Sequence, residues 1–382
     1  MRQIVCLSTS PWHPIPTRKQ QVMSRLEDAE ILYFDPPVSV IAPLKDKSAR
    51  PKLRAWREPG ERVKEHLTVY ALPPVWPFFN KYRWVNRRNQ RKIADYVNKI
   101  MRENGFEKPI LWTYSPTSCD AVDRIPHSAL VYDCVDRHSA YGGLMDPKMV
   151  DGMEMDLARR TDMVFATAES LCERLKAANP KARFIPNGAN YELFVRASEK
   201  LACPEDMRDI HGPVFGFVGA LQQCIEYDYV EAAAKARPDW NFVFIGQEKP
   251  GVDLSALRAL PNTRFLGLKK HDVLPDYLSN FDVCLNLFAA SELSKDVSPL
   301  KFYEYLATGK PIVSTPQPDQ ILQFAPVIEI ARTQKEFIDR CEKALGDNDP
   351  ERKKARIEAG RASSWDSRVA QMSGILREMK IF

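Results

Sequence analysis

Lys301 and Glu304 stand three residues apart in VSPLKFYEYLATGKPIVST, residues 297–315. Pro299 and Gly309 predict a helix that starts near the proline and ends around the glycine. Residues three apart share one face of a helix. Backbone N–H groups at a helix start, with a lysine beside them, suit a phosphate, and a glutamate slightly further in can accept hydrogen bonds from sugar hydroxyls. The alternative is an ordinary surface ion pair on an amphipathic helix.

A second group of titratable residues follows an apolar run in ALVYDCVDRHSAYGG, residues 129–143. Asp133, Asp136 and His138 come where this predicted strand ends, and ligands of open parallel sheets bind beyond the carboxyl ends of the strands. A carboxylate there can take a proton from a hydroxyl group as a general base. The alternative is that Asp133 and Asp136 are ordinary turn and helix-cap residues.

A third segment, residues 71–97, interleaves aromatic residues with Lys and Arg, and residues 1–100 together carry 19 Lys and Arg against 9 Asp and Glu. Aromatic rings beside cations favour an anionic membrane surface. They could equally stack on nucleic acid, but no nucleic-acid-binding motif accompanies them. A half-buried helix with a solvated basic face is a further alternative. We expect contact with the inner membrane surface through this basic half, and no nucleic acid partner.

An α/β framework must position these residues. Apolar runs such as RQIVCLS, ALVYDCV and PVFGFVGAL alternate with helix-length segments, which is typical of parallel sheets covered by helices. A chain of 382 residues exceeds the size of most single cores, so two domains are expected. Turn-forming residues gather in 186–212, which favours a boundary there. We expect domains at 1–186 and 187–360, and a final helix at 361–382 that packs back on the first domain.

Composition excludes several classes of protein. No apolar run is long enough to span a bilayer, and the opening MRQIVCLSTSPW is typical of a first strand and not of an export signal. The eight cysteines form no C-x-x-C pair, and no histidine cluster has the spacing of metal ligands. We expect reduced thiols in the cytoplasm, no metal site and no cofactor.

The stretch 297–315, together with FVGAL and DVCLNLF, resembles the nucleotide-sugar-binding half of GT-B glycosyltransferases, especially the group-1 (GT4-like) family. The resemblance implies an α/β fold of two Rossmann-like α/β/α domains that face a central cleft. Asp296 and Glu304 have the spacing of the family's acidic-x7-Glu element, in which the second acidic residue commonly binds the ribose of the donor. The donor-binding residues would be Ser298, Lys301, Glu304, Gly219 and Lys270, without a metal ion.

The sequence departs from the family at two places. Members often follow the glycine of the first strand of this half with an arginine and then a lysine, whereas VGALQQCIEYDY has Ala220 and no lysine. Lys301 is then the first candidate to neutralise the charge of the donor diphosphate, and Lys269 or Lys270 is the next candidate. WHPIPTRKQQVMSRL replaces the N-terminal Gly-Gly loop, and Arg18 and Lys19 are its candidates for phosphate or acceptor contact. The alternative for both is a pair of solvated charges at a helix start.

The segment 129–143 also resembles the matching loop of the inverting xanthan-type glucuronosyltransferases, which act on a lipid diphosphate-linked oligosaccharide. That resemblance implies that Asp136 is the catalytic base. Because group-1 members are usually retaining and often place a histidine near this loop, His138 is the rival catalytic residue.

These resemblances imply a cytoplasmic enzyme, peripherally associated with the inner face of the membrane. It would move a sugar from a nucleoside diphosphate, most simply UDP, to a lipid-linked or polysaccharide acceptor of a cell-surface glycan such as exopolysaccharide, lipopolysaccharide or capsule. Two alternatives stay open. One is a sugar-nucleotide epimerase of the same fold, and the other is a catalytically silent sugar-nucleotide-binding partner.

Overall fold

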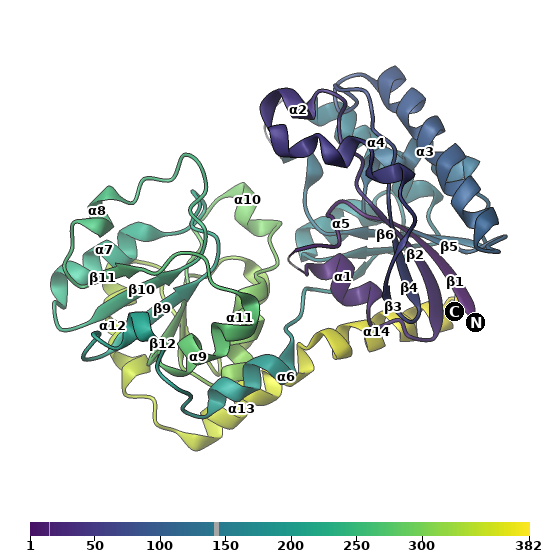
Figure 1. The fold of residues 1–382 in the computed structure, drawn as a ribbon. Helices are drawn as coiled ribbons and strands as arrows, with labels where there is room; N and C mark the ends of the chain where they lie inside the picture. Colours follow the sequence, from purple (N-terminus) through teal and green to yellow (C-terminus); the bar gives the residue numbers. More distant parts are fainter. Residues whose placement is uncertain (15, 141–144) are drawn as a thin grey trace. The chain divides into compact units, whose positions relative to one another are not determined.

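Each half of the chain builds a β-sheet with helices on both faces, as the computed structural model shows (Figure 1). The structure describes residues 1–14, 16–140 and 145–382. Unit 1 comprises Met1–Pro186 and Val369–Phe382, and unit 2 comprises Asn187–Arg368. The α/β class expected from the alternating apolar runs is therefore confirmed.

Unit 1 contains an eight-stranded sheet in the order β3-β4-β2-β1-β5-β6-β7-β8, in which only the β3–β4 pair is antiparallel among the described pairings. Its strands carry near-continuous apolar runs because both faces of the sheet are covered. They are β1 (Arg2–Leu7), β2 (Ala29–Asp35), β3 (Glu61–Lys64), β4 (Leu67–Ala71), β5 (Ile110–Thr113), β6 (Ala129–Cys134), β7 (Met163–Ala166) and β8 (Arg183–Phe184).

Two sets of helices cover the two faces of this sheet. On one face, side chains from α3, α4 and α5 pack with Val5, Leu7 and Leu32, and on the other face α1 and α14 pack with Ile4 and Cys6. Short 3-10 segments, η4 (Pro116–Asp120), η5 (Val122–Arg124) and η6 (His138–Ala140), follow β5 and β6. The helices are α1 (Arg18–Met23), α2 (Ala42–Lys45), α3 (Arg83–Glu103), α4 (Pro147–Arg160), α5 (Glu169–Lys176) and α14 (Trp365–Glu378), the last of which is shared by the two units.

Unit 2 contains a six-stranded parallel sheet in the order β11-β10-β9-β12-β13-β14. Aromatic rings from neighbouring strands stack on one face. The ring centres of Phe244 and Phe265 are 5.0 Å apart, and those of Phe215 and Phe242 are 5.3 Å apart. The strands are β9 (Val214–Val218), β10 (Asn241–Ile245), β11 (Thr263–Phe265), β12 (Val283–Asn286), β13 (Ile312–Ser314) and β14 (Glu329–Ile330).

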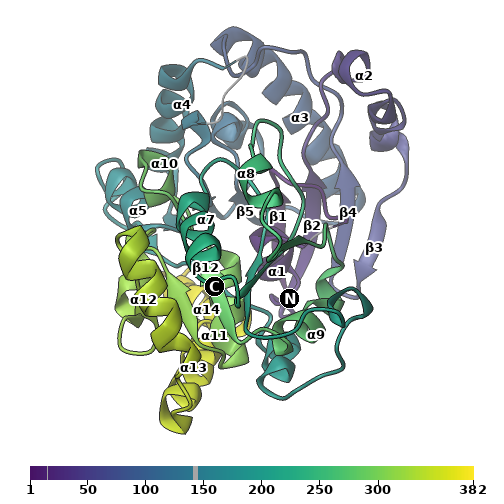
Figure 2. The ribbon, with the colours of Figure 1, turned by 90° about the vertical axis from the view of Figure 1, so that its left-hand side faces the viewer.

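The helices of unit 2 also form two layers. Figure 2 shows α7 and α12 side by side, and their apolar residues pack with Phe215 and Phe242. The opposite layer contains α6, α9, α11 and α13, packed with Val218 and Val243. The helices are α6 (Tyr191–Phe194), α7 (Tyr227–Ala236), α8 (Ser255–Arg258), α9 (Leu274–Ser279), α10 (Glu292–Lys295), α11 (Leu300–Thr308), α12 (Gln334–Leu345) and α13 (Pro350–Ala362).

Residues 187–212, rich in turn formers, are part of unit 2. The segment forms α6 and the 3-10 turns η7 (Val195–Ser198) and η8 (Glu205–Met207). Phe194 and Met207 are buried against the core that holds α11. The chain leaves unit 2 again within α14, so residues 361–368 stay with unit 2 and Val369–Phe382 complete unit 1. None of the described helices is long and apolar enough to cross a membrane.

Candidate active site

Glu304 is the centre of a polar cluster on α11. Its Oε2 lies 2.9 Å from Nζ of Lys301, and its Oε1 lies 3.1 Å from Nε2 of His271. The Glu304 side chain is only 6% exposed, whereas Lys301 and His271 each keep about a third of their surface. The predicted meeting of Lys301 and Glu304 on one helix face is therefore confirmed, and His271 is a third member that the sequence did not indicate.

The charge on Glu304 is fixed by its neighbours. Burial alone would raise the pKa of this carboxyl group, but the Lys301 ammonium group and the hydrogen bond with His271 outweigh it and lower the pKa below its ordinary value. The group is thus a carboxylate, which only accepts hydrogen bonds. A buried carboxylate next to a partly exposed ammonium group can hold hydroxyl groups on one side and a phosphate on the other.

Two glycines make a backbone corner beside this cluster. Gly219 follows β9 and Gly246 follows β10. A Cβ at Gly246 would lie 1.8 Å from the carbonyl oxygen of Gly219, so only glycine fits there. A Cβ at Gly219 would lie 4.0 Å from Cγ of Lys301. Gly219, at the carboxyl end of β9, therefore presents bare backbone next to the lysine.

Hydrogen bonds of Tyr305 and Ser298 hold α11 and the residues just before it against the sheet and against the start of unit 2. The Tyr305 hydroxyl accepts a hydrogen bond from the backbone N–H of Val218 at 2.7 Å and donates one to the carbonyl oxygen of the same residue at 3.2 Å. Ser298 Oγ accepts from the N–H of Asn187 at 3.0 Å, while Asn187 Nδ2 donates to the Ser298 carbonyl oxygen at 2.9 Å. Among the residues that the structure describes, none accepts a hydrogen bond from the Ser298 hydroxyl group.

The two lysines after β11 differ in their surroundings. Lys269 forms an ion pair with Asp206 at 2.6 Å, and its ammonium group lies 5.4 Å from the ring centre of Tyr277. Lys270 is exposed. Of the two, Lys270 is the one whose charge is not already neutralised by Asp206, and its role in donor binding stays a prediction.

Arg18 and Asp133 form a buried ion pair in unit 1. Nε of Arg18 lies 3.0 and 2.9 Å from the two carboxylate oxygens, and its Nη1 donates to the carbonyl oxygens of Ile185 and Pro186. The side chains are 2% and 0% exposed. The alternative of a solvated charge at a helix start is therefore wrong for Arg18, and Asp133 is a strand residue and not a turn residue. Acceptor contact by Arg18 stays a prediction.

Lys19, Asp136 and His138 form the second titratable cluster. Lys19 is also buried, with its ammonium group 5.8 Å from the ring centre of Tyr114, so it is not a solvated charge either. Burial lowers the pKa of Lys19, against the attraction of Asp136 and Asp133. Burial likewise lowers the pKa of His138, against Glu154 and Asp136. A neutral imidazole beside a carboxylate can accept a proton.

A pocket of about 270 Å³ opens beside His138 in unit 1. It lies where β1, β2 and β5 end, because Ser8, Pro36 and Ser115 all line it. Sequence reasoning missed this pocket, although polar residues directly after apolar strands were its signal. The lining residues are Leu7, Ser8, Thr9, Pro36, Pro37, Leu72, Phe79, Asn80, Gln90, Ile93, Ser115, Pro116, Thr117, Ser118, His138, Met145 and Val150.

No three His, Cys, Asp or Glu side chains among the residues that the structure describes are grouped as metal ligands would be. The Tyr-Gly-Gly residues 141–143, which follow the His138 segment, lie outside the described residues.

Known proteins resemble this chain in a family model, in sequence along most of its length and in fold. Residues 212–347 match the family model described as glycosyl transferases group 1. The putative teichuronic acid biosynthesis glycosyltransferase TuaH of Bacillus subtilis is 28% identical over 343 residues, which cover 84% of this chain and 86% of that protein.

Solved structures agree in fold along the whole chain. Sucrose-phosphate synthase from Thermosynechococcus elongatus superposes with a TM-score of 0.72 at 14% identity, covering 100% of both chains. Anabaena HepE, solved in complex with UDP, superposes with a TM-score of 0.68 at 13% identity, covering 99% of this chain and 100% of that one. Residues 212–347 of unit 2 are thus similar to a group 1 glycosyltransferase domain, and the chain as a whole has the GT-B fold of these solved glycosyltransferases.

Proposed function

We propose that this glycosyltransferase moves a sugar from a UDP-linked donor to a lipid-linked acceptor during the synthesis of a cell-surface glycan. The observation that carries the proposal is the buried carboxylate of Glu304, paired with Lys301 and bonded to His271 at the start of α11. The donor class is supported by HepE, whose structure contains UDP, and the glycan class by the relative named for teichuronic acid biosynthesis.

Unit 2 would hold the donor. The Lys301 ammonium group and the N–H groups at the start of α11 would attract the diphosphate, and Gly219, which has no side chain beside Lys301, would let it approach the backbone. The Glu304 carboxylate would accept hydrogen bonds from the ribose hydroxyls. Ser298 and exposed Lys270 would add contacts to the phosphates. These charges would stabilise the leaving UDP without a metal ion.

Unit 1 would hold the acceptor in the pocket beside His138. In the transfer, the acceptor hydroxyl oxygen forms a bond to the anomeric carbon, and the bond from that carbon to the diphosphate oxygen breaks with its electron pair leaving on UDP. The hydroxyl proton passes to Asp136 or to neutral His138. Lys19 lies in the same cluster and would contact acceptor phosphate, while Arg18 would position the cluster through Asp133.

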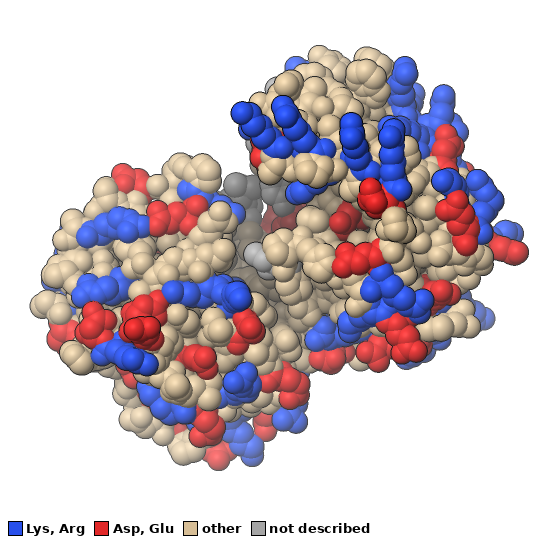
Figure 3. Space-filling view, viewed as in Figure 1, with Lys and Arg blue, Asp and Glu red and all other residues tan. Residues whose placement is uncertain are grey.

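A lipid-linked acceptor would bring the protein to the inner face of the cytoplasmic membrane. Residues 71–97, in which aromatic residues alternate with Lys and Arg, support this location, because Trp76 and Trp84 are 57% and 68% exposed. Lys and Arg side chains gather on the visible face of unit 1 near α2 and α3 (Figure 3).

Nucleotide binding tests the donor site without knowledge of the sugar. UDP, GDP and ADP would be titrated by calorimetry into the wild type and into Lys301→Ala and Glu304→Ala. Each variant loses a charge-assisted contact, so we expect selective UDP binding that weakens by roughly ten- to a hundredfold in both. The matched controls are Lys235→Ala and Glu231→Ala, which break an exposed ion pair on α7.

The controls separate a donor site from a simple helix ion pair. UDP affinity should be unchanged in both control variants. Absence of nucleotide binding, or equal loss in all four variants, would overturn the donor site. Conversion of the UDP-sugar into its epimeric UDP-sugar, without any acceptor, would favour an epimerase instead.

A further inference from the structure

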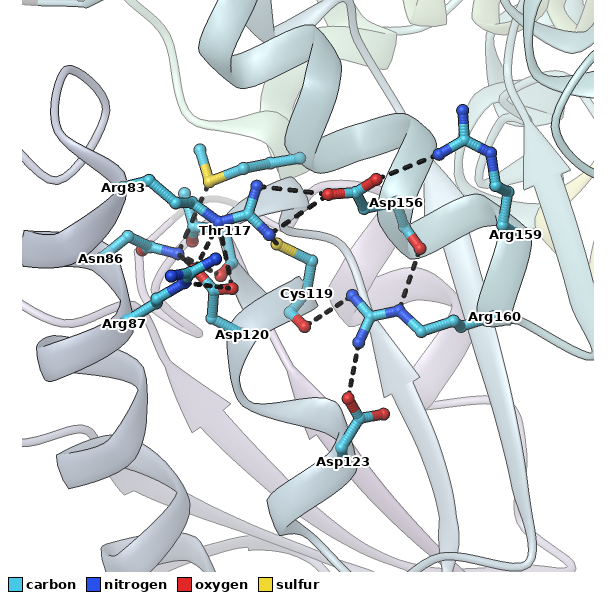
Figure 4. A network of polar contacts seen from close by, with 11 residues as sticks. Arg83, Asn86, Arg87, Thr117, Cys119, Asp120, Asp123, Asp156, Arg159 and Arg160 are labelled. Carbon is cyan, nitrogen blue, oxygen red and sulfur yellow. Dashed lines mark hydrogen bonds and ion pairs between the residues drawn. The ribbon is translucent and has the colours of Figure 1, made fainter.

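A basic groove in unit 1 lies outside both clusters described above. It has a volume of about 760 Å³ and is formed by α3, by the 3-10 turns η4 and η5, and by the end of α4. Six arginines and three aspartates line it, which gives a formal charge of +3. We call it the arginine groove, and Figure 4 shows its polar contacts.

Two of the arginines build the frame of the groove. Arg83 donates from Nε to both carboxylate oxygens of Asp120, at 3.0 and 2.8 Å, and its Nη2 lies 3.3 Å from Asp156. Arg160 pairs with Asp123 at 2.8 Å and donates to the backbone carbonyl of Asp156. These contacts join α3, η4, η5 and α4 (Figure 4), and they use the aspartates of the groove.

The other arginines keep unused positive charge. Arg87 is 69% exposed and lies 3.9 Å from Asp120, which Arg83 already holds. Arg159 is 61% exposed and shares Asp156 with Arg83. Arg91 and Arg124 are exposed and form no ion pair with any residue that the structure describes. Guanidinium groups with free donors bind phosphate oxygens in pairs.

An exposed tryptophan of α3 lies beside the arginine groove. A shallower hollow of about 490 Å³ shares Arg87 and Arg91 with the arginine groove and is also lined by Trp84. Trp84 is 68% exposed, and Tyr82, the residue before α3, is 45% exposed. Tryptophan and tyrosine beside arginines are typical of the boundary between lipid headgroups and acyl chains.

We propose that the arginine groove binds the phosphate of an anionic phospholipid headgroup while Trp84 rests at the membrane interface. The excess of arginine over aspartate supplies the attraction, and the Arg83 and Arg160 contacts hold the groove open without an anion. The inference deepens the proposed membrane association and does not depend on the donor chemistry of unit 2. It assigns the lipid contact to a defined set of guanidinium groups and not to net charge alone.

Vesicle binding with two charge-matched variants tests the site. The full chain would be co-sedimented with vesicles of pure phosphatidylcholine and with vesicles of equal parts phosphatidylcholine and phosphatidylglycerol. The groove variant is Arg91→Gln/Arg124→Gln/Arg159→Gln. The control variant is Arg50→Gln/Arg54→Gln/Arg57→Gln, which removes three exposed arginines of unit 1 that do not line the groove. Thermal unfolding of both variants would confirm that neither has lost its fold.

The result expected is binding to the anionic vesicles alone, weakened on the order of a hundredfold in the groove variant and clearly less in the control variant. Equal weakening of the two variants would overturn the site, because it would show attraction by net charge only. Equal binding to both vesicle types would overturn it as well.

A soluble anion is the other source of the same phosphate chemistry. Calorimetric titration of the wild type with inorganic phosphate and with pyrophosphate is expected to show no binding that the groove variant loses. Such a loss would overturn the lipid assignment. UDP titration of the wild type is independent of all these arms, so a protein that binds UDP but not anionic vesicles would refute this inference and leave the proposed function standing.

Discussion

Burial makes Glu304 depend on its two partners. A carboxylate that is 6% exposed is costly to ionise unless nearby groups compensate for the lost hydration. Lys301 supplies a charge, and His271 supplies a hydrogen bond from a separate 3-10 turn, η9 (His271–Val273). The ring centre of Phe194 lies 5.1 Å from the imidazole centre in an edge-to-face contact that helps to fix the position of this histidine.

Removal of His271 should therefore change both the affinity for UDP and its pH dependence. In His271→Ala the pKa of Glu304 rises, because one of the groups that lower it is gone. We expect UDP binding to weaken by roughly tenfold and to be lost at a higher pH on acidification than in the wild type. Calorimetry over a pH series measures both effects. His211→Ala, at an exposed histidine of the same unit, should match the wild type.

Asp35 gives a pH dependence of stability. Burial raises the pKa of this carboxyl group from 3.8 to about 6, against a hydrogen bond from the N–H of Trp12. Between these two pH values the folded protein binds the proton and the unfolded chain does not. Protonation thus favours the folded state, and the contribution of Asp35 to stability improves as the pH falls from about 6 to 3.8.

Urea unfolding of the wild type and of Asp35→Asn measures this contribution, because other titrating groups are common to both proteins. The free energy of unfolding of the wild type minus that of the variant should rise as the pH falls through this window. A difference that stays constant with pH would contradict the raised pKa.

The sequence indicates only the local part of these clusters. Lys301 and Glu304 are three residues apart, so helix periodicity alone brings them together. His271 and Glu304 are 33 residues apart, and Arg18 and Asp133 are 115 apart, so their pairing depends on the strand order. The residues around Arg18 in the sequence do not indicate a carboxylate partner. The sequence alone therefore allowed Arg18 to be a solvated charge.

At the scale of elements, α11 is held from three directions. Its end at Gly309 has a φ of 69°, which favours glycine, and Tyr305 ties the helix to Val218 on β9. On a third side α13 approaches so closely that a Cβ at Gly360 would lie 2.5 Å from the backbone nitrogen of Ala307. The position of Lys301 and Glu304 thus depends on a helix that lies more than forty residues later in the chain.

Gly360→Ala should separate α13 from α11. The added methyl group meets backbone, which cannot turn aside, so we expect a loss of about 1–3 kcal/mol in the free energy of unfolding and weaker UDP binding. The control is Gly152→Ala on α4, where a Cβ meets nothing within 4 Å. That change should stabilise the protein by about 0.5–1 kcal/mol. Chemical denaturation and calorimetry measure the two effects, and equal behaviour of both variants would contradict the close crossing.

The bounds of α11 could be predicted, and the crossing with α13 could not. Pro299 and Gly309 mark the start and the end of the helix in the sequence itself, and the structure places α11 between them. Gly360 gives the opposite impression, because a glycine inside a helix usually weakens it. A glycine is required at this position because the backbone of α11 lies against it, and that contact is visible only in the folded structure.

At the scale of the whole molecule, unit 1 takes the end of α14 into its core. Val369, Met372 and Leu376 are at most 5% exposed and pack with Val22 and Met23 of α1. The alternation of apolar runs predicts two sheets, and the structure confirms both. The residue at which α14 passes from one unit to the other lies inside a continuous helix, so no break in secondary structure marks it.

Leu376→Ala should therefore loosen unit 1 and not unit 2. The cavity left by a fully buried leucine costs about 2–5 kcal/mol. Hydrogen exchange followed by mass spectrometry should show faster exchange in β1, β2 and α1, with β9 to β14 unchanged. Leu278→Ala, at a fully buried leucine of α9, should give the reverse pattern. Uniform acceleration in both units would mean that they unfold as one.

This use of α14 sets an order for the nascent chain. Residues 369–382, which cover one face of the sheet of unit 1, are synthesised after every residue of unit 2. Unit 2 is continuous in the sequence, whereas part of the apolar face of the sheet of unit 1 lacks its cover until residues 369–382 are available. Most chains complete their first domain first. Here the domain that is translated first receives its last residues only after the second domain has been translated.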